Sequence, residues 1–360
     1  SLLDWMIPGL DPSAWAAGPV GPNDGILVML GLYGGNDGLN TVVPITDADY
    51  YSQRQWLNGD LAIAADDTLQ LDSQSGLNKR LPALKQFWDA GQLAIVEGVG
   101  YLQQNLSHFS SMAYWMAGRP PGAGVPNTGW LGRWLDGYTD GNPDLFAAAE
   151  VGNSVPLYLI GSAARGTGVP AEMPGWGSAT DTRSERNYQA VRQMVSGQTG
   201  GWGAACTQAF VDGFDIAAEL APRYPPDAAP GTPEIVHQLE IAARLINANL
   251  GFRVLTAGWG DFDSHAGQPA MHNARMTELN AAVARFFAVL DPAWASRVTV
   301  MTFSEFGRTL YANDGAGTDH GSAAPQFVFG ANVRGGRYGQ RPSLAGLGRW
   351  DRMAHHVDMR

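Results

Sequence analysis

The sequence predicts an α/β protein with a doubly wound, mostly parallel sheet, helices on both of its faces, and loop insertions. Short apolar runs without polar alternation, such as residues 25–32, recur between stretches of helical spacing. Such runs are typical of strands that are buried on both faces. A hydrophobic content of 45% supports a full core, while 46 glycines and 22 prolines with only 16% charged residues indicate many turns and long loops.

The apolar runs and helical patterns alternate along the chain. Six strands are expected, at residues 25–32, 93–99, 155–160, 253–257, 298–303 and 326–330. Helices are expected at residues 81–90, 107–115, 186–195, 207–220, 233–250 and 268–290. We expect one domain over residues 1–360, in which the polar segment 161–203, rich in Gly, Ser and Thr, forms a surface excursion or lid.

Composition excludes several classes of protein. A net charge of -11 argues against a nucleic-acid partner. The single cysteine, Cys206, rules out an internal disulfide framework and a multi-cysteine zinc site. No apolar run has the length needed to span a membrane. The first residue is Ser1 and not Met, which fits a processed chain.

Polar residues with metal-binding chemistry follow the expected strands. In open α/β sheets, ligands bind beyond the carboxyl ends of the strands. Carboxylates, imidazoles and a hydroxyl on separate loops are the composition of a divalent-metal hydrolase site. The four groups are Asn36 and Asp37; Ser107 and His108; Asp261, Asp263 and His265; and Glu305, Arg308, Asp319 and His320.

Each group also has a structural interpretation. Asp37 lies in a glycine-rich turn and could form an Asx-turn. Ser107 is well placed to cap a helix, which is compatible with a nucleophile that gains from the helix amides. Glu305 is expected to cap or to pair with Arg308, and Arg308 would hold either that carboxylate or an anionic substrate oxygen.

The remaining histidines divide into two sets. His237 lies within the apolar pattern of a helix and is interpreted as structural, and His272 is expected on a helix surface. His355 and His356 could supply a late metal ligand or belong to a solvated terminus.

Five motifs in order resemble a family of secreted bacterial proteins catalogued as domain of unknown function 1501. They are residues 33–44, 107–109, 262–268, 303–308 and 318–321. The resemblance runs from about residue 26 to residue 360. It implies export from the cytoplasm, often by a twin-arginine signal, and hence a periplasmic or secreted protein. That family is in turn similar to the alkaline phosphatase and sulfatase superfamily, which implies an alkaline phosphatase-like fold.

The wider resemblance implies two divalent metal ions, with Zn, Mg, Mn and Ca all open. Asp37, Asp319 and His320 would hold one metal, bridged to the nucleophile Ser107. Asp263 and His265 would hold the other, completed by His108, His355 or His356.

The predicted function is therefore metal-dependent hydrolysis of phosphate mono- or diesters outside the cytoplasm, on a small-molecule, glycan-linked or lipid-linked anionic ester. A sulfatase of the formylglycine type is not expected, because Cys206 lies in no Cys-x-Pro-x-Arg motif. Two alternatives stay open. One is a non-catalytic surface or assembly protein on the same fold, and the other is an enzyme acting on a sulfate ester or a phosphoglycan.

Overall fold

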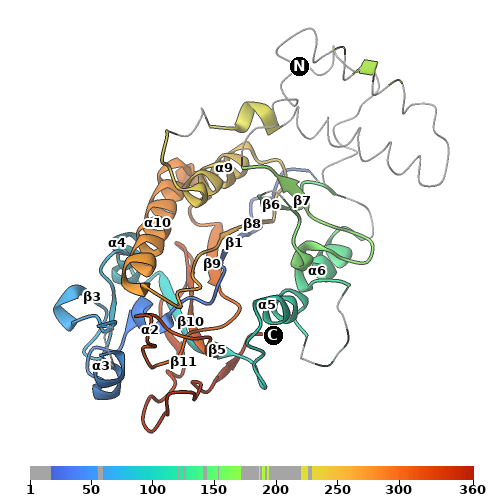
Figure 1. Ribbon diagram of the computed structural model, residues 1–360. Coiled ribbons are helices and arrows are strands. Elements are labelled where there is room, and N and C mark those ends of the chain that lie inside the picture. The colour runs from blue at the N-terminus through green and yellow to red at the C-terminus, as the bar shows by residue number, and fades with distance from the viewer. Residues whose placement is uncertain are drawn as a thin grey trace.

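The computed structural model has a central mixed sheet between two layers of helices (Figure 1). The structure describes residues 18–55, 60–119, 122, 124, 127–140, 144–152, 154–171, 186, 189–190, 193, 220–225 and 229–360.

Nine strands form the main sheet, eight of them in the order β11-β5-β10-β9-β1-β8-β6-β7, with β12 paired to β5. Its strands are β1 (Ile26–Leu32), β5 (Leu93–Gly100), β6 (Ala148–Val151), β7 (Thr167–Val169), β8 (Val254–Trp259), β9 (Val298–Phe303), β10 (Ala324–Phe329), β11 (Gly336–Gly339) and β12 (Val357–Asp358). Only the pairings of β10 with β5 and with β9 are antiparallel; the other strand pairs are parallel. The predicted α/β class with a mostly parallel sheet is confirmed.

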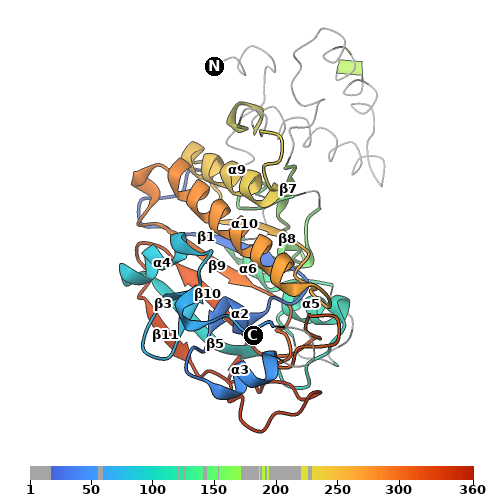
Figure 2. The same cartoon turned by 60° about the vertical axis from the view of Figure 1, so that its left-hand side comes forward.

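Helices cover both faces of the sheet. They are α2 (Gly38–Thr41), α3 (Ala48–Arg54), α4 (Pro82–Asp89), α5 (His108–Ala117), α6 (Trp130–Tyr138), α9 (Glu234–Ala248) and α10 (Gln268–Val289). In Figure 2, α9 and α10 lie side by side across one face. A small second sheet, β2 (Val42–Val43), β4 (Gly76–Asn78) and β3 (Thr68–Gln70), lies beside α3.

The alternation of side chains along β1 explains the two layers. Val28 and Leu30 belong to the core that includes α9 and α10. Met29 belongs to the opposite core, with Trp115 of α5 and Leu131 of α6. Because successive side chains of a strand point to opposite faces, an unbroken apolar run is what a strand between two helical layers requires.

One expected strand is wrong. Residues 155–160 contain a 3-10 turn, Leu157–Leu159, after Pro156. Proline has no N–H to donate to a sheet ladder. Tyr158 and Leu159 are buried in the core beneath α5 and α6, which accounts for the apolar pattern. The strand in this region is instead β6, which the sequence analysis missed because Glu150 interrupts its apolar run.

Part of the expected surface excursion can be compared with the structure. Residues 161–171 include β7, an edge strand of the main sheet. Most of residues 172–203, with the helix expected at 186–195, and nearly all of the helix expected at 207–220 lie outside the described residues.

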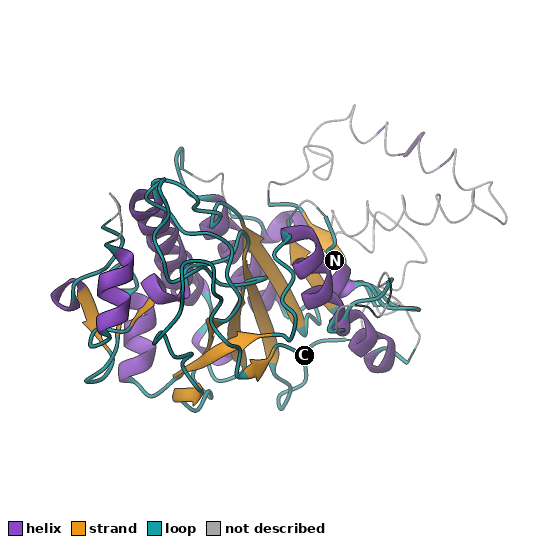
Figure 3. Cartoon of the chain, turned by 60° about the horizontal axis from the view of Figure 1, so that its bottom comes forward, coloured by secondary structure: helices purple, strands orange, loops and turns teal. Residues whose placement is uncertain are grey.

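The predicted polar groups meet at one edge of the sheet. The loops after β1, β5, β8 and β9 leave from the carboxyl ends of strands that share one direction. Residues 319–320 precede β10, and because β10 runs antiparallel, its beginning lies at the same edge. Long loops, drawn in teal, lie in front of the sheet in Figure 3.

Candidate metal centre

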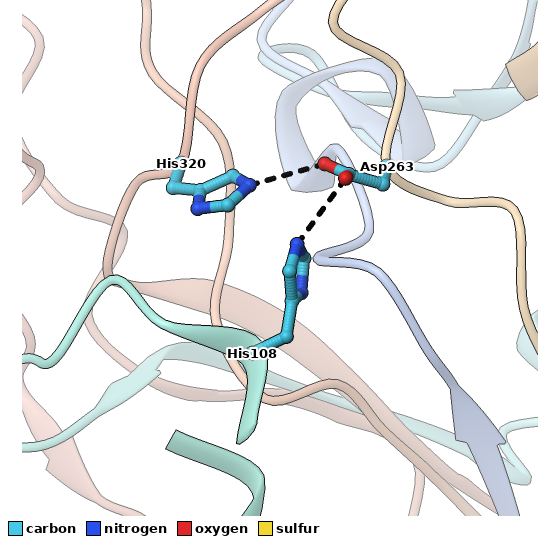
Figure 4. A group of neighbouring side chains, drawn as sticks. All are labelled: His108, Asp263 and His320. Atoms are coloured by element: carbon cyan, nitrogen blue, oxygen red, sulfur yellow. Dashed lines mark hydrogen bonds and ion pairs between the residues drawn. The ribbon is translucent and has the colours of Figure 1, made fainter. Parts of the chain in front are cut away.

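Three segments far apart in sequence bring His108, Asp263 and His320 together (Figure 4). His108 is the first residue of α5, Asp263 follows β8, and His320 precedes β10. One ligand atom from each lies within 4.8 Å of the others. A fourth side chain, His265, places its Nε2 atom 3.0 Å from Asp263 Oδ1 and 2.9 Å from His320 Nε2. These four residues are called the His/Asp cluster below.

Each imidazole of the His/Asp cluster has an acceptor at its Nδ1 atom. His108 Nδ1 lies 2.8 Å from Glu305 Oε1, and His320 Nδ1 lies 2.7 Å from the Leu106 carbonyl oxygen. His265 Nδ1 lies 3.1 Å from Asp319 Oδ1. An acceptor at Nδ1 requires the ring proton there, so the Nε2 atom of a neutral ring carries a lone pair.

In their neutral forms the three rings direct Nε2 lone pairs toward Asp263 or toward one another. His320 Nε2 is 3.1 Å from Asp263 Oδ1, and His108 Nε2 is 3.3 Å from Asp263 Oδ2. His108 Nε2 is buried and makes no hydrogen bond of acceptable geometry. Imidazole nitrogens and a carboxylate that face one another can hold a cation between them, and this donor set is one that zinc and similar divalent metals take. The residues present fit a metal ion.

The carboxylate of this cluster is held in its charged form. Burial raises the pKa of Asp263, but the hydrogen bond and charge of Arg308, with smaller effects of His320 and His265, lower that pKa to about 2. Burial also lowers the pKa of His320, against its hydrogen bonds to Leu106 and Asp263. At neutral pH the centre thus presents a carboxylate and a neutral His320, the forms that bind a metal.

Glycine lets the loops after β1 and β8 approach this closely. Gly34 has φ +115°, and a Cβ atom there would lie 2.5 Å from the backbone nitrogen of Asp263. The same reason applies at Gly317, where a Cβ would lie 2.3 Å from the carbonyl carbon of His265. The glycines that flank the predicted ligands are therefore required for backbone packing around the cluster.

Arg308 does not lie where a substrate oxygen could reach it. Its side chain has no exposed area. The guanidinium donates to the carbonyl oxygens of Gly35 at 2.8 Å and Thr318 at 3.0 Å, and it pairs with Asp263. Arg308 ties the loops of the site together and fixes Asp263, so the expectation that it binds substrate has no support in this geometry.

The expected pairing of Glu305 with Arg308 is wrong. Glu305 Oε1 accepts from the backbone N–H of Gly34 at 2.9 Å, in addition to its contact with His108. Glu305 is 3% exposed, so it orients His108 from inside the protein. A carboxylate behind a ligating imidazole is a common second layer of metal sites.

Asp37 lies in a buried ion pair outside the His/Asp cluster. Arg54 NH2 donates to Asp37 Oδ1 at 2.9 Å, and Arg54 NH1 pairs with Oδ2. Asp37 also caps α2 by accepting from Leu39 N at 3.1 Å, and Gln268 donates to Oδ2. Burial raises the pKa of Asp37, but Arg54 outweighs this and holds that pKa below its usual range. The buried guanidinium of Arg54 therefore balances the charge of the Asp37 carboxylate.

Ser107 stands between two residues that contact the His/Asp cluster. It precedes His108 and follows Leu106, whose carbonyl oxygen faces His320. Ser107 is exposed and occupies the N-cap position of α5, yet its side chain makes no capping hydrogen bond. Ser107 is therefore an exposed hydroxyl residue next in sequence to His108 of the cluster.

Other histidines are placed differently from the expectation or apart from the cluster. His272 is buried, not on the helix surface, and its Nε2 atom contacts Thr41 Oγ1 at 3.3 Å and Asn36 Oδ1 at 3.2 Å. Of the three candidates for the last ligand, His108 belongs to the group of converging ligand atoms, whereas His355 and His356 pack near Gly100 and Gly98.

The sequence analysis missed Arg54 and Gln268 as partners of the candidate site residues. Arg54 lies on α3, in a polar stretch without a strand before it, so no pattern distinguishes it. Gln268 ends the motif at residues 262–268; its Oε1 atom accepts from Ser264 at 3.0 Å and from Thr318 at 2.6 Å. It links the Asp37–Arg54 pair to both loops of the cluster.

The family model for the protein of unknown function DUF1501 matches residues 93–356, and the chain belongs to this family. No curated protein matches the sequence.

The chain is similar to several solved structures. An alkaline phosphatase superfamily protein from Vibrio parahaemolyticus is 10% identical, with 93% of this chain and 68% of that chain covered and a TM-score of 0.39. The alkaline phosphatase of the Antarctic bacterium TAB5 is 10% identical, with 88% and 95% covered and a TM-score of 0.39. The periplasmic domain of EcEptC from Escherichia coli, in complex with Zn, is 7% identical, with 88% and 76% covered and a TM-score of 0.38.

Among the described residues, no helix combines the length and the apolar character needed to cross a membrane.

Proposed function

We propose that the protein is an extracytoplasmic, metal-dependent hydrolase of phosphate esters, with one divalent cation held by the His/Asp cluster and Ser107 as nucleophile. The observation that carries the proposal is the arrangement of the three imidazoles. Each has its Nδ1 atom on an acceptor, and their Nε2 atoms face Asp263 or one another. This is the way in which proteins orient histidines toward a metal.

The proposal replaces the expected two metals by one. Asp37, expected in the first metal site, has a guanidinium as its cation, and Asp319 contacts His265 Nδ1. Asp319 would then orient His265 in the way that Glu305 orients His108. The cluster would hold the cation through His108, Asp263, His265 and His320.

When bound, the cation would lower the pKa of nearby hydroxyl groups and offset the charge that develops on phosphate oxygens. The side chains of the protein carry out the remaining steps. The hydroxyl oxygen of Ser107 attacks phosphorus, the alcohol leaves with a proton, and water hydrolyses the resulting phosphoserine. Arg308 and Glu305 hold Asp263 and His108 in place from within the protein.

Metal content tests the site directly. The protein, incubated with Zn²⁺ or Mn²⁺ and then desalted, should retain about one ion per chain. A His320→Ala variant should retain little, whereas the matched control His237→Ala, on α9, should retain as much as the parent. Two tightly held ions per chain would contradict the single-cation proposal, and none would contradict the metal centre.

Activity tests the nucleophile. With p-nitrophenyl phosphate, Ser107→Ala should lower kcat at least about 100-fold while metal content stays unchanged. Ser110→Ala, on the next turn of α5, is the matched control and should retain activity. Equal kcat in Ser107→Ala and the parent would show that Ser107 is not the nucleophile.

A further inference from the structure

The connection between β5 and α5 exposes three large apolar side chains. Phe109 is 91% exposed, Leu102 is 69% exposed and Leu106 is 36% exposed. These three residues, called the apolar rim, fall within eight positions of the chain. Single apolar residues on a surface are ordinary, but three large ones on one short segment indicate a contact surface.

Two polar side chains at the ends of this segment, Tyr101 and Ser111, are directed inward. Ser111 has no exposed area, and its Oγ atom accepts from Gln104 Nε2 at 2.7 Å. The hydroxyls of Ser111 and Tyr101 lie 3.0 Å apart, and Tyr101 also accepts from the backbone N–H of Asn105. Ser111 in turn donates to the Glu305 carbonyl oxygen at 2.8 Å. The loop is therefore held by buried hydrogen bonds in a conformation that leaves the apolar rim in water.

The apolar rim is fixed next to the His/Asp cluster. The carbonyl oxygen of Leu106 accepts from His320 Nδ1 at 2.7 Å, which requires the Nδ1–H tautomer inferred above. Ser107 and His108 lie between Leu106 and Phe109 in sequence. The proposed nucleophile and one metal ligand are thus flanked by exposed apolar side chains on both sides.

We infer that the substrate is an amphiphilic phosphate ester, whose anionic head enters the His/Asp cluster and whose alkyl chain lies on the apolar rim. The inference rests on the proposed function and names its substrate class. Apolar surface in water is unfavourable, and an alkyl chain that covers Phe109 and Leu102 removes that surface from water. Hydrolysis breaks the P–O bond to the alcohol: water supplies the new oxygen on phosphate, and the alcohol that carries the chain leaves with a proton.

Binding of n-alkyl phosphonates separates this inference from catalysis, because phosphonates carry no ester bond to hydrolyse. The Zn²⁺-incubated protein is titrated calorimetrically with ethyl to octyl phosphonate, below their micelle concentrations. Affinity should rise about two- to fourfold per methylene, the upper value corresponding to the transfer of one methylene from water.

The double variant Leu102→Ser/Phe109→Ser should bind ethyl phosphonate like the parent and lose the chain-length dependence. Trp134→Ser is the matched control. Trp134 is 37% exposed but lies on α6 beside a hollow lined by Ile26, Val254 and Thr299, near the amino ends of the strands. That variant should keep the parental dependence on chain length.

The possible outcomes distinguish the apolar rim as a substrate site from the proposed esterase activity. Chain-length-dependent binding without hydrolysis of the matching alkyl phosphates supports the apolar rim and contradicts the esterase. Hydrolysis with the same kcat/KM from ethyl to octyl phosphate supports the esterase and overturns the apolar rim as a substrate site. Absence of binding at every chain length overturns it as well. Binding to phosphatidylcholine vesicles, together with a phosphonate affinity that does not change with chain length, also overturns the inference. The apolar rim would then bind a lipid surface and not the substrate.

Discussion

The Asp37–Arg54 pair and the His/Asp cluster are two carboxylate-centred sites, yet they differ in how far a guanidinium satisfies the carboxylate. Asp37 and Arg54 are 1% and 0% exposed, and the guanidinium contacts both carboxylate oxygens. Asp263 is 44% exposed; buried Arg308 contacts its Oδ1 atom, while Oδ2 faces His108 Nε2. A carboxylate whose two oxygens are both held by a buried guanidinium is a structural element, whereas a partly exposed one that leaves an oxygen facing an imidazole can still bind a cation.

The largest effect is expected from breaking the buried pair. Arg54→Met should lower the free energy of unfolding by about 3–5 kcal/mol, because it leaves the Asp37 carboxylate buried without its cation. Urea denaturation measures this. In the double variant Asp37→Asn/Arg54→Met most of the loss should be recovered, since no charge remains to be buried. A change below about 1 kcal/mol in the single variant would show that Asp37 is not held by this pair.

The pH dependence of stability follows from His272, which packs beside the buried pair. Burial lowers the pKa of His272 from 6.5 to about 4, opposed by Asp37 and reinforced by the charges of Arg54 and Arg308. The unfolded chain therefore binds more protons between pH 6.5 and pH 4, and this contribution, about 3 kcal/mol when complete, is lost as the pH falls through that range.

Urea denaturation at a series of pH values tests this. In His272→Gln the slope of unfolding free energy against pH between 6.5 and 4 should become smaller than in the parent. The remaining slope would come from groups such as His320, whose pKa is also lowered from 6.5. An unchanged slope would contradict the burial of a neutral His272.

In the His/Asp cluster the corresponding change should lower metal affinity, and it should also cost some stability because Asp263 pairs with buried Arg308. Asp263→Asn should weaken Zn²⁺ binding by about 100-fold, equivalent to about 2.7 kcal/mol, since a charged ligand is lost. Asp261→Asn, in the same loop, is the matched control because Asp261 is 80% exposed. Competition with a chelator measures both. Equal Zn²⁺ affinities in the two variants would show that Asp263 is not a metal ligand.

A smaller effect is expected from the carboxylate behind His108. Glu305→Gln keeps an oxygen that can accept from His108 Nδ1 but removes the charge. Metal affinity should fall about tenfold, since carboxylates behind ligating histidines typically contribute 10- to 100-fold. Glu97→Gln, at a buried carboxylate that pairs with Arg337, is the control and should leave the affinity unchanged. If Glu305→Gln binds Zn²⁺ as the parent does, Glu305 only supports the loop.

Much of the fold was predictable because its strands and longest helices carry local patterns. The apolar runs at β1, β5, β8, β9 and β10, and the helical spacing of α4, α5, α9 and α10, were all found within a few residues of their observed bounds. The exceptions have local causes as well. Glu150 interrupts the apolar run of β6, so no strand was expected there. The apolar residues near Leu159 belong to a 3-10 turn and not to a strand.

The candidate site was predictable in part. The sequence singled out Asp263, His265, His320 and His108, because ligand-type residues after buried strands share one sheet edge. It also singled out Asp37 and Asp319, which contact Arg54 and His265 instead. It could not tell that Arg308 would pair with Asp263 and Glu305 with His108, since both pairs join segments that approach only in the folded chain.

The sequence by itself determined the layers of the fold, the edge at which the ligands gather and the glycines that let their loops approach, because these follow from local periodicity and from the lack of a Cβ atom. Only the tertiary structure decided which carboxylate had both oxygens held by a buried guanidinium, which imidazole nitrogen met an acceptor, and which apolar side chains stayed in water. These outcomes depend on distances of a few ångströms between residues that are far apart in sequence, such as Gly34 and Glu305, which lie 271 positions apart.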